Sequence, residues 1–397
     1  MLNVYGVGLL TPWGQGESVF FDALNRAEPV EDSFDEVNPV RYLTVDSYVP
    51  SDHFDEKQLH NLDRNSTLVI GVAKFAFENA RHEWGESGQG AVGVVVGSAH
   101  SIATSMSDFE ESVLRDGIRR SRIGIFPNTV MCAPASRVSI VEKIKGANTT
   151  VASGLNSGLD AIGCAKLAIE NEVVGLMLVG GADAFSEKIW QGLKQEGVIW
   201  EAKGKKPRKA LFKNKFVPVE SACALLIGKD NQFKAAHSSQ VRCQIAAYAN
   251  SFSVCKKRDV AERAINLRDL ISLALSQAKV EFSDIDFVIA SGYFDENLTR
   301  VEGEALSLMS FPNTMPILRP KAFIGETFAA QGLMSVVIAI GIMDEKICSE
   351  SIRSMTLRAK EPGGCIEKDR NWGLILQLDP SGHNSVVIVK KAKVENG

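Results

Sequence analysis

The segment Gly146–Gly163 has the composition of a strand that turns sharply into a helix, an arrangement in which many enzymes place a nucleophile. A strand is predicted over Thr149–Ala152 and a helix from near Asn156, and the residues between them are mostly Ser and Gly, which a tight turn requires. In a nucleophilic enzyme the side chain at the tip of this turn is Cys or Ser, activated beside a helix N-terminus. Here the tip is Leu155, which can neither attack a thioester nor donate a hydrogen bond.

Four motifs follow one another along the chain at sensible spacing. They are Tyr5–Gly14 (G-x-G-x-x-[ST]-P-x-G), Gly146–Gly158 (G-x-N-x-T-V in its first part, then Ser157 and Gly158), Leu178–Ala184 (L-x-G-G-[AS]-[ED]-A) and Phe216–Ala222, which retains Glu220. Each motif alone is weak evidence, but the four together resemble the motifs of the β-ketoacyl synthase family and favour its fold. The resemblance spans nearly the whole chain.

The resemblance implies an α/β protein with the thiolase-like duplicated fold, in which five layers alternate as αβαβα. We place the N-terminal ketosynthase-like half at residues 1–232 and the C-terminal half at residues 233–397. Direct sequence identity between the two halves is not evident.

Members of the family use a Cys nucleophile that carries the acyl chain, two His residues that promote decarboxylation and stabilise the oxyanion, a Lys and a gating Phe. In this chain the Cys position is Leu155, the first His position is Ser291 and the second is Glu326, while Lys321 is retained. Asp379–Asn384 stands where the family has G-F-G-G-T-N, so the gating Phe is absent. The resemblance therefore implies a chain without catalytic residues, and we expect it not to be an enzyme.

Since family members are dimers whose subunits line one another's acyl tunnels, a subunit without catalytic residues can still shape the tunnel of an active partner. We expect a chain-length factor of a type II polyketide synthase, which forms a heterodimer with an active ketosynthase and works with an acyl carrier protein. The product class would be an aromatic polyketide or an aryl polyene. Two alternatives remain: a homodimeric acyl-binding or carrier-protein-binding scaffold, and an acyltransferase with a non-standard nucleophile.

By resemblance, Ser101–Asp116 is the interface helix that closes the end of the tunnel. The residues expected to line the tunnel or the interface are Ala103, Ser105, Met106 and Cys132. His100 is the histidine closest to a plausible cleft, and a solvent-facing or capping role is favoured for it. Lys321 and Glu326 are predicted to form a buried ion pair. Alternatively, Ser291 and Glu326 could bond to each other, but they would not form a catalytic pair, because no base lies beside a nucleophile.

Apolar runs alternate with helical patterns along both halves, which is typical of a layered α/β protein. Buried strands are predicted at Val92–Gly97, Val173–Gly180, Ala222–Gly228, Val241–Tyr248, Asp286–Ser291 and Asn384–Val389. Helices are predicted at Asn156–Glu170, around Leu267–Ala278 and at Leu333–Ile342, which has no charged residue and should be interior.

Composition excludes several other classes of function. The chain has 44 Lys and Arg against 48 Asp and Glu, a net charge of -4, which gives no case for nucleic-acid or membrane binding. Seven dispersed cysteines and the absence of a signal-like N-terminus favour a reduced, cytoplasmic protein, and no metal or cofactor site is expected. The basic segment Glu201–Lys215 is predicted to be a solvated loop, and the alternative is a docking patch for an acidic protein partner. The acidic segment Glu31–Glu36 has no evident chemistry.

Overall fold

The computed structural model of the 397-residue chain describes residues 1–28, 30, 42–80, 92–100, 102–199, 215–229, 241–254, 259–292, 294–309, 315–357 and 370–392. The acidic segment Glu31–Glu36, all of the basic segment except Lys215, and the 232/233 boundary lie outside these residues, as do Cys255 and Cys365. The boundary therefore stays a prediction.

The N-terminal half contains the elements up to β6. They are β1 (Leu2–Thr11), β2 (Gly14–Gln15), α1 (Glu17–Asn25), α2 (Glu56–Leu59), α3 (Arg64–Asn79), β3 (Val92–Gly97), α4 (Ala103–Asp116), α5 (Ala133–Val141), β4 (Asn148–Val151), α6 (Ser157–Glu170), β5 (Leu176–Asp183), α7 (Glu187–Gln195) and β6 (Ser221–Gly228).

The C-terminal half contains the remaining elements. They are β7 (Cys243–Phe252), α8 (Val260–Ala278), β8 (Phe287–Ile289), α9 (Glu296–Leu308), β9 (Ile317–Leu318), α10 (Lys321–Ile324), α11 (Ala330–Met343), α12 (Ser349–Leu357), β10 (Trp372–Leu378) and β11 (His383–Lys391).

The two halves repeat one topology. The sheet order is β1-β6-β5-β3-β4 in the first half and β7-β11-β10-β8-β9 in the second, so that corresponding strands occupy corresponding places. The pairings also match: the first two contacts in each half are antiparallel and the last two parallel. The halves are joined where Leu2–Val4 of β1 pairs with Cys243–Ile245 of β7. The duplicated fold expected from the sequence is confirmed.

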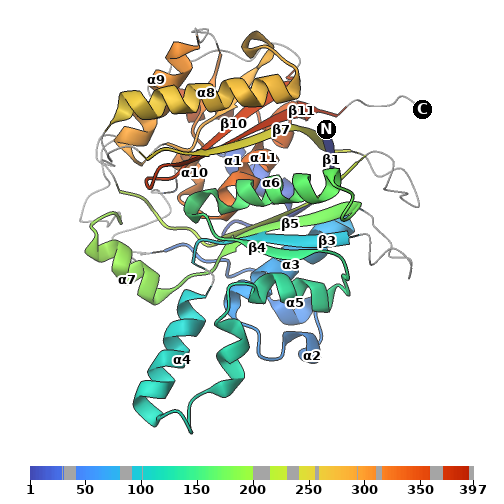
Figure 1. Ribbon diagram of the computed structural model, residues 1–397, viewed down its shortest axis with the longest axis vertical. Coiled ribbons are helices and arrows are strands. Elements are labelled where there is room, and N and C mark those ends of the chain that lie inside the picture. The colour runs from blue at the N-terminus through green and yellow to red at the C-terminus, as the bar shows by residue number, and fades with distance from the viewer. Residues whose placement is uncertain are drawn as a thin grey trace.

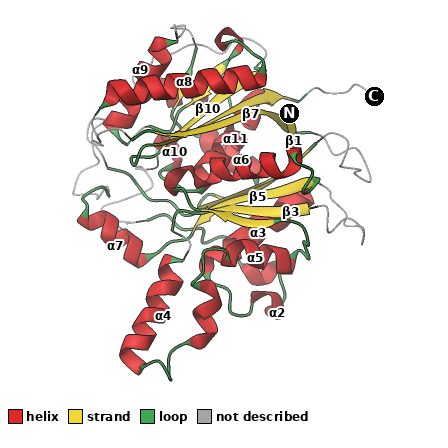
Figure 2. Ribbon diagram, viewed as in Figure 1, coloured by secondary structure: helices red, strands yellow, loops and turns green. Residues whose placement is uncertain are grey.

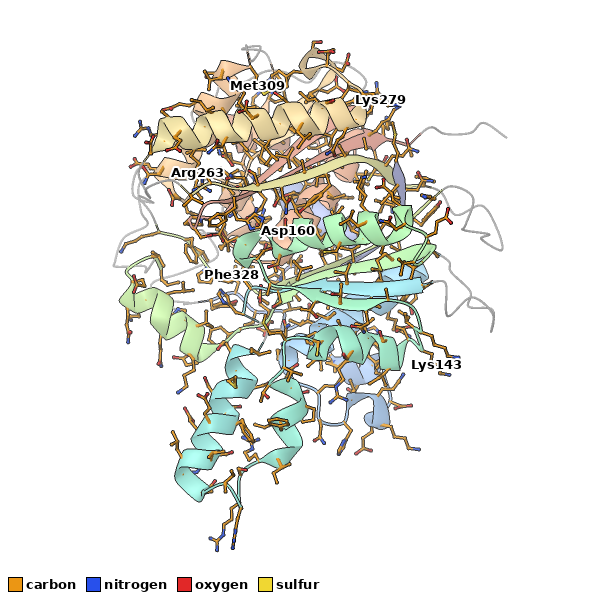
Figure 3. The ribbon with its side chains drawn as sticks, in the orientation of Figure 1. Lys143, Asp160, Arg263, Lys279, Met309 and Phe328 are labelled. Carbon is orange, nitrogen blue, oxygen red and sulfur yellow. The ribbon has the colours of Figure 1, made fainter. Side chains whose placement is uncertain are left out.

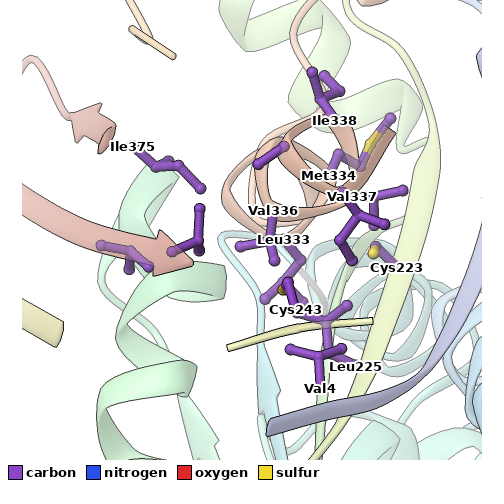
Figure 4. Packing of buried hydrophobic residues seen from close by; sticks show 14 of the residues in the cluster. Val4, Cys223, Leu225, Cys243, Leu333, Met334, Val336, Val337, Ile338 and Ile375 are labelled. Carbon is purple, nitrogen blue, oxygen red and sulfur yellow. The ribbon is translucent and has the colours of Figure 1, made fainter. Parts of the chain in front are cut away.

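Five layers follow from this duplication (Figure 1). Helices α3 and α5 cover the outer face of the first sheet, α8 and α9 cover the outer face of the second, and α6 and α11 lie between the sheets (Figure 2). Three clusters of buried apolar side chains fill the spaces between layers, one in the middle and one under each outer layer. The central cluster joins residues of both halves, such as Val4 and Leu225 with Leu333 and Val337 (Figure 4).

Helix α11 is buried along its whole length, as its uncharged sequence predicts. The strand expected at Val173–Gly180 begins only at Leu176, because the backbone amide of Val173 bonds back to the Ala168 carbonyl and helix α6 ends there with Glu172 at φ 58°. Likewise β8 spans only Phe287–Ile289 and not the predicted Asp286–Ser291; beyond its end, the Ser291 amide donates to the Glu302 carboxylate of α9 and not to a neighbouring strand. Within the described residues, no helix combines the length and apolarity needed to span a membrane.

Candidate functional site at the strand–helix elbow

The predicted elbow is formed by residues 152–158, between β4 and α6. Gly154, Leu155 and Asn156 make a single 3-10 turn, and Gly154 adopts φ 69°, a left-handed conformation that favours glycine. Gly158 lies so close to the start of α11 that a Cβ there would be 2.1 Å from the Ala329 carbonyl oxygen. The small residues of the motif are therefore explained by backbone geometry and by the close crossing of α6 and α11.

Leu155 occupies the tip of this elbow and is partly exposed. Its backbone amide donates a hydrogen bond of 3.0 Å to Oδ2 of Asp379, in the turn between β10 and β11. The other carboxylate oxygen of Asp379 accepts a bond of 2.7 Å from the Ser381 amide. At this position the chain has an alkyl side chain, and the amide beside it already has an acceptor.

Ser291 lies just beyond β8, buried next to the same turn. Its hydroxyl accepts a hydrogen bond of 2.9 Å from the amide of Leu378, and donates one of 3.1 Å to Glu302 of α9. The Glu302 carboxylate also accepts the amides of Ser291 and Gly292 and pairs with Arg319, which is fully buried. Ser291 is therefore part of a buried structural network and is not bonded to Glu326.

Glu326 lies in the loop between α10 and α11, and its side chain is about 5% exposed, as is that of Lys321. The Lys321 ammonium is 2.6 Å from Oε2 of Glu326, so the buried ion pair predicted from the sequence is present. Oε1 of Glu326 accepts the amide of Phe328 at 3.0 Å. Phe328 adopts φ 51°, which is uncommon for a non-glycine residue and is held by its neighbours.

A further carboxylate, Asp183 at the end of β5, connects the elements around the site. It accepts the amides of Ala99 and His100 after β3 and the amide of Ala329 at the start of α11. The His100 ring stands edge-on to Phe328, with 5.1 Å between ring centroids. His100 is thus partly buried and packed against Phe328.

Asp160, in the first turn of α6, forms a second polar network below the elbow. Its carboxylate accepts bonds from the hydroxyls of Tyr248 at 2.7 Å and Ser385 at 2.6 Å, and also from Ser153. Nε2 of His383 lies 3.2 Å from it. Burial, followed by the charge of Asp160, raises the pKa of Tyr248 far above its ordinary value of 10.0, so this phenol stays protonated. Figure 3 shows Asp160, Phe328 and Arg263 near the same end of the sheets.

The tunnel and interface candidates lie on α4 and at the start of α5. Ala103 is partly exposed, Met106 is 38% exposed and Cys132 is exposed, whereas Ser105 is buried with its hydroxyl bonded to Asp63 at the start of α3. Whether these residues line a tunnel stays a prediction. Among the described residues, no group of three His, Cys, Asp or Glu side chains could hold a metal ion.

Sequence reasoning did not assign a role to Asp379, Glu302 or Asp183. The signal for Asp379 was its place in the segment that resembles G-F-G-G-T-N, where a carboxylate replaces a glycine. Its contact with Leu155 joins residues 224 apart in the chain, so only the fold shows it.

Comparison with known proteins agrees with this architecture. Residues 3–232 match the model of the beta-ketoacyl synthase N-terminal domain, and residues 242–354 match that of the C-terminal domain. The chain is 24% identical over 378 residues (90% of this chain, 80% of the relative) to the actinorhodin polyketide putative beta-ketoacyl synthase 1 of Streptomyces coelicolor. It is 22% identical over 351 residues (85% of this chain, 84% of the relative) to the tetracenomycin polyketide synthase ketoacyl synthase beta subunit of Streptomyces glaucescens.

A solved structure of a type II polyketide acyl-carrier protein in complex with its ketosynthase has the same fold. The TM-score is 0.77 at 17% identity, with 98% of this chain and 99% of that chain covered. Because both family models match and together span most of the chain, the protein belongs to the beta-ketoacyl synthase family.

Proposed function

We propose that this chain is a non-catalytic chain-length factor, which forms a heterodimer with an active ketosynthase and shapes its acyl tunnel during type II polyketide biosynthesis. The observation that carries the proposal is Leu155 at the tip of the elbow, where a nucleophile would stand. Its two companions are also unsuited to catalysis, since Ser291 is bonded to Glu302 and Glu326 is paired with Lys321. A relative named as a ketoacyl synthase beta subunit supports the assignment.

The surface of the N-terminal half supports the presence of a protein partner. Helix α4 and the following 3-10 segment (Ile123–Asn128) extend from the body of the molecule as an arm, residues 103–128 (Figure 1). Several large apolar side chains on the arm are exposed: Leu114 by 86%, Ile118 by 76%, Ile123 by 68% and Phe126 by 53%. Single exposed apolar side chains are ordinary, but several gathered on one arm are typical of a protein–protein interaction site.

Strand β4 also ends the sheet without a second neighbour in the described part of the chain. Asn148 and Thr149 on it are exposed, so its free edge is open to pairing with a strand of another subunit. We assign the arm and this edge to the active ketosynthase, and the acyl carrier protein to the assembled pair. The carrier protein found with its ketosynthase in the related structure supports that second partner.

Co-expression with an active ketosynthase from the same source tests the proposal. We expect a 1:1 complex by native mass spectrometry, and condensation of malonyl groups from the carrier protein only when that partner is present. A stable homodimer that takes up no ketosynthase would favour the scaffold alternative. Covalent labelling of the lone chain by a mechanism-based acyl probe would favour the acyltransferase alternative.

The tunnel residues are tested in the same complex. We expect Ala103→Phe or Met106→Trp to shorten the polyketide, because a larger side chain at the end of a tunnel leaves less room for the acyl chain. Product length by mass spectrometry is the measurement, and Leu273→Trp on the distant helix α8, half-exposed in this chain, is the control. Unchanged product length in both α4 variants would remove these residues from the tunnel.

A further inference from the structure

We propose that the Asp379 carboxylate occupies the oxyanion position at the elbow, so that this chain's own site reacts only slowly with an acyl thioester even if a thiol is placed at its tip. The inference rests on the proposed function and deepens it, since it concerns the elbow at Leu155, where the proposed function assigns no catalysis.

The Asp379 carboxylate accepts hydrogen bonds from backbone amides at the elbow and on its own turn. A thioester carbonyl that is attacked at the elbow becomes an oxyanion, and backbone amides beside the nucleophile stabilise such an oxygen. The amide of Leu155 is the donor in that position, and it points at Oδ2 of Asp379 at 3.0 Å. The Ser381 amide, on the facing turn, bonds to Oδ1 at 2.7 Å. The carboxylate thus already supplies the negative charge that the Leu155 amide would otherwise stabilise on a substrate.

The Asp379 carboxylate also fills the space beside the elbow. A Cβ on Gly154 would be only 2.6 Å from Oδ2 of Asp379, so the carboxylate lies directly against the backbone of the elbow. Asp379 itself is 9% exposed, and little space remains between the two segments for a carbonyl group. An acyl group can reach the amide of Leu155 only if the Asp379 side chain moves away.

The turn that carries Asp379 is held in place from its other side. The guanidinium of Arg263, on α8, donates bonds to the Asp379 carbonyl at 2.6 Å and to Oδ1 of Asn384 at 3.0 Å. The backbone amide of Ser253 also holds the turn, since it donates a hydrogen bond of 2.9 Å to the Gly382 carbonyl. Hydrogen bonds that involve a charged group are the stronger ones, so the turn is well anchored where it stands.

The test introduces a thiol with Leu155→Cys and compares two reagents on the full-length chain. With acetyl-pantetheine, the thiolate attacks the carbonyl, a new carbon–sulfur bond forms, the bond to pantetheine breaks, and pantetheine leaves as a thiolate that takes a proton from water. With iodoacetamide, the thiolate displaces iodide from a saturated carbon and no oxyanion forms. Both rates at position 155 are measured by peptide mass spectrometry. Thiol ionisation and access affect both reactions, so the ratio of the acylation rate to the alkylation rate reports how well the backbone amides stabilise an oxyanion.

We expect Leu155→Cys alone to acylate slowly, and Asp379→Gly in that background to raise the ratio of acylation to alkylation by about 100-fold, the size of effect typical of one oxyanion donor. Asp379→Asn should give a smaller rise, since a neutral amide oxygen is a weaker acceptor and is displaced more easily. The matched control is Asp286→Asn, because Asp286 also accepts two backbone amides but lies at the opposite end of β10.

An unchanged ratio in both Asp379 variants, with normal circular dichroism and melting, would overturn the inference, as would fast acylation of the Leu155→Cys chain itself. If Asp379→Gly fails to fold, Asp379→Asn decides the test. Its ratio of acylation to alkylation must then rise by more than that of the Asp286→Asn control. Assembly with the ketosynthase is measured separately. A complex that forms normally while the ratio does not change contradicts this inference and leaves the proposed function standing.

Discussion

At the scale of single residues, carboxylates occupy the backbone amides around the site. Asp379 accepts the amide of Leu155, Glu326 that of Phe328 and Asp183 that of Ala329. Amides at a helix N-terminus attract anions, and here the chain itself provides them. These backbone amides therefore already have carboxylate acceptors within the chain, and their hydrogen bonds stabilise the fold.

The buried pair of Glu302 and Arg319 allows a direct prediction. Both side chains are 0% exposed, and the carboxylate also accepts the amides of Ser291 and Gly292. We expect Glu302→Gln to lower the free energy of unfolding by about 3–5 kcal/mol, because it leaves the Arg319 charge buried without its carboxylate. Denaturant unfolding measures this, with Glu304→Gln, in an exposed pair with Arg300, as the control. A loss below about 1 kcal/mol would mean that carbonyl groups alone satisfy Arg319.

Glu142, at the end of α5, predicts a pH dependence. Burial raises the pKa of its carboxyl above the ordinary value of 4.5, although the charge of Lys74 opposes the rise. The folded chain then binds the proton more tightly than the unfolded chain, so the contribution of this group to stability is present below pH 4.5 and is lost as the pH rises through the folded pKa.

Glu142→Gln should therefore raise the denaturation midpoint at pH 7.5, and the difference from the unmodified chain should shrink as the pH approaches 4.5. Urea unfolding at several pH values measures it, and Glu110→Gln on the exposed face of α4 is the control. If Glu142→Gln were less stable than the unmodified chain at pH 7.5, the raised pKa of Glu142 would be contradicted.

At the scale of elements, the site depends on how closely α6 and α11 approach each other. Gly158 permits this approach, since a Cβ would meet the Ala329 carbonyl at 2.1 Å. We expect Gly158→Ala to destabilise the fold by about 1–3 kcal/mol through overpacking. Gly192→Ala in α7 is the control, because no atom lies within 4 Å of the Cβ it would add. It should instead stabilise the chain by a few tenths of a kcal/mol to about 1 kcal/mol, which calorimetry resolves.

If Gly158→Ala melted like the unmodified chain, the α6–α11 crossing would be more tolerant than its geometry implies, and the Ser and Gly content of the elbow would need another explanation.

At the scale of the whole molecule, strand β4 ends the sheet without a second neighbour among the described residues, and the arm extends from the same half of the chain. We expect Leu114→Asp to weaken assembly with the ketosynthase by at least 10-fold without changing the melting temperature of the lone chain, because the 86% exposed side chain contributes nothing to its own core. Analytical ultracentrifugation of the co-expressed pair measures assembly. Leu273→Asp on α8, 50% exposed on the far half, should have no effect.

Equal assembly of the Leu114 and Leu273 variants would show that the arm is outside the interface, and would direct attention to the edge of β4.

The sequence by itself determined the family, the duplicated α/β fold and the residue types at the positions that we match to the family's catalytic residues. These features are local: the motif around Leu155 and the apolar runs such as Val92–Gly97 can be recognised within a few residues of chain. The pair of Lys321 and Glu326 was also predictable, since the two residues flank one short helix and turn.

Only the tertiary structure decided which groups meet at the site. Asp379 reaches the amide of Leu155 because the β10–β11 turn of one half packs against the elbow of the other, and Ser291 faces Glu302 and not Glu326 because α9 lies over β8. Such contacts depend on the packing of layers from both halves, which no local pattern of residues encodes.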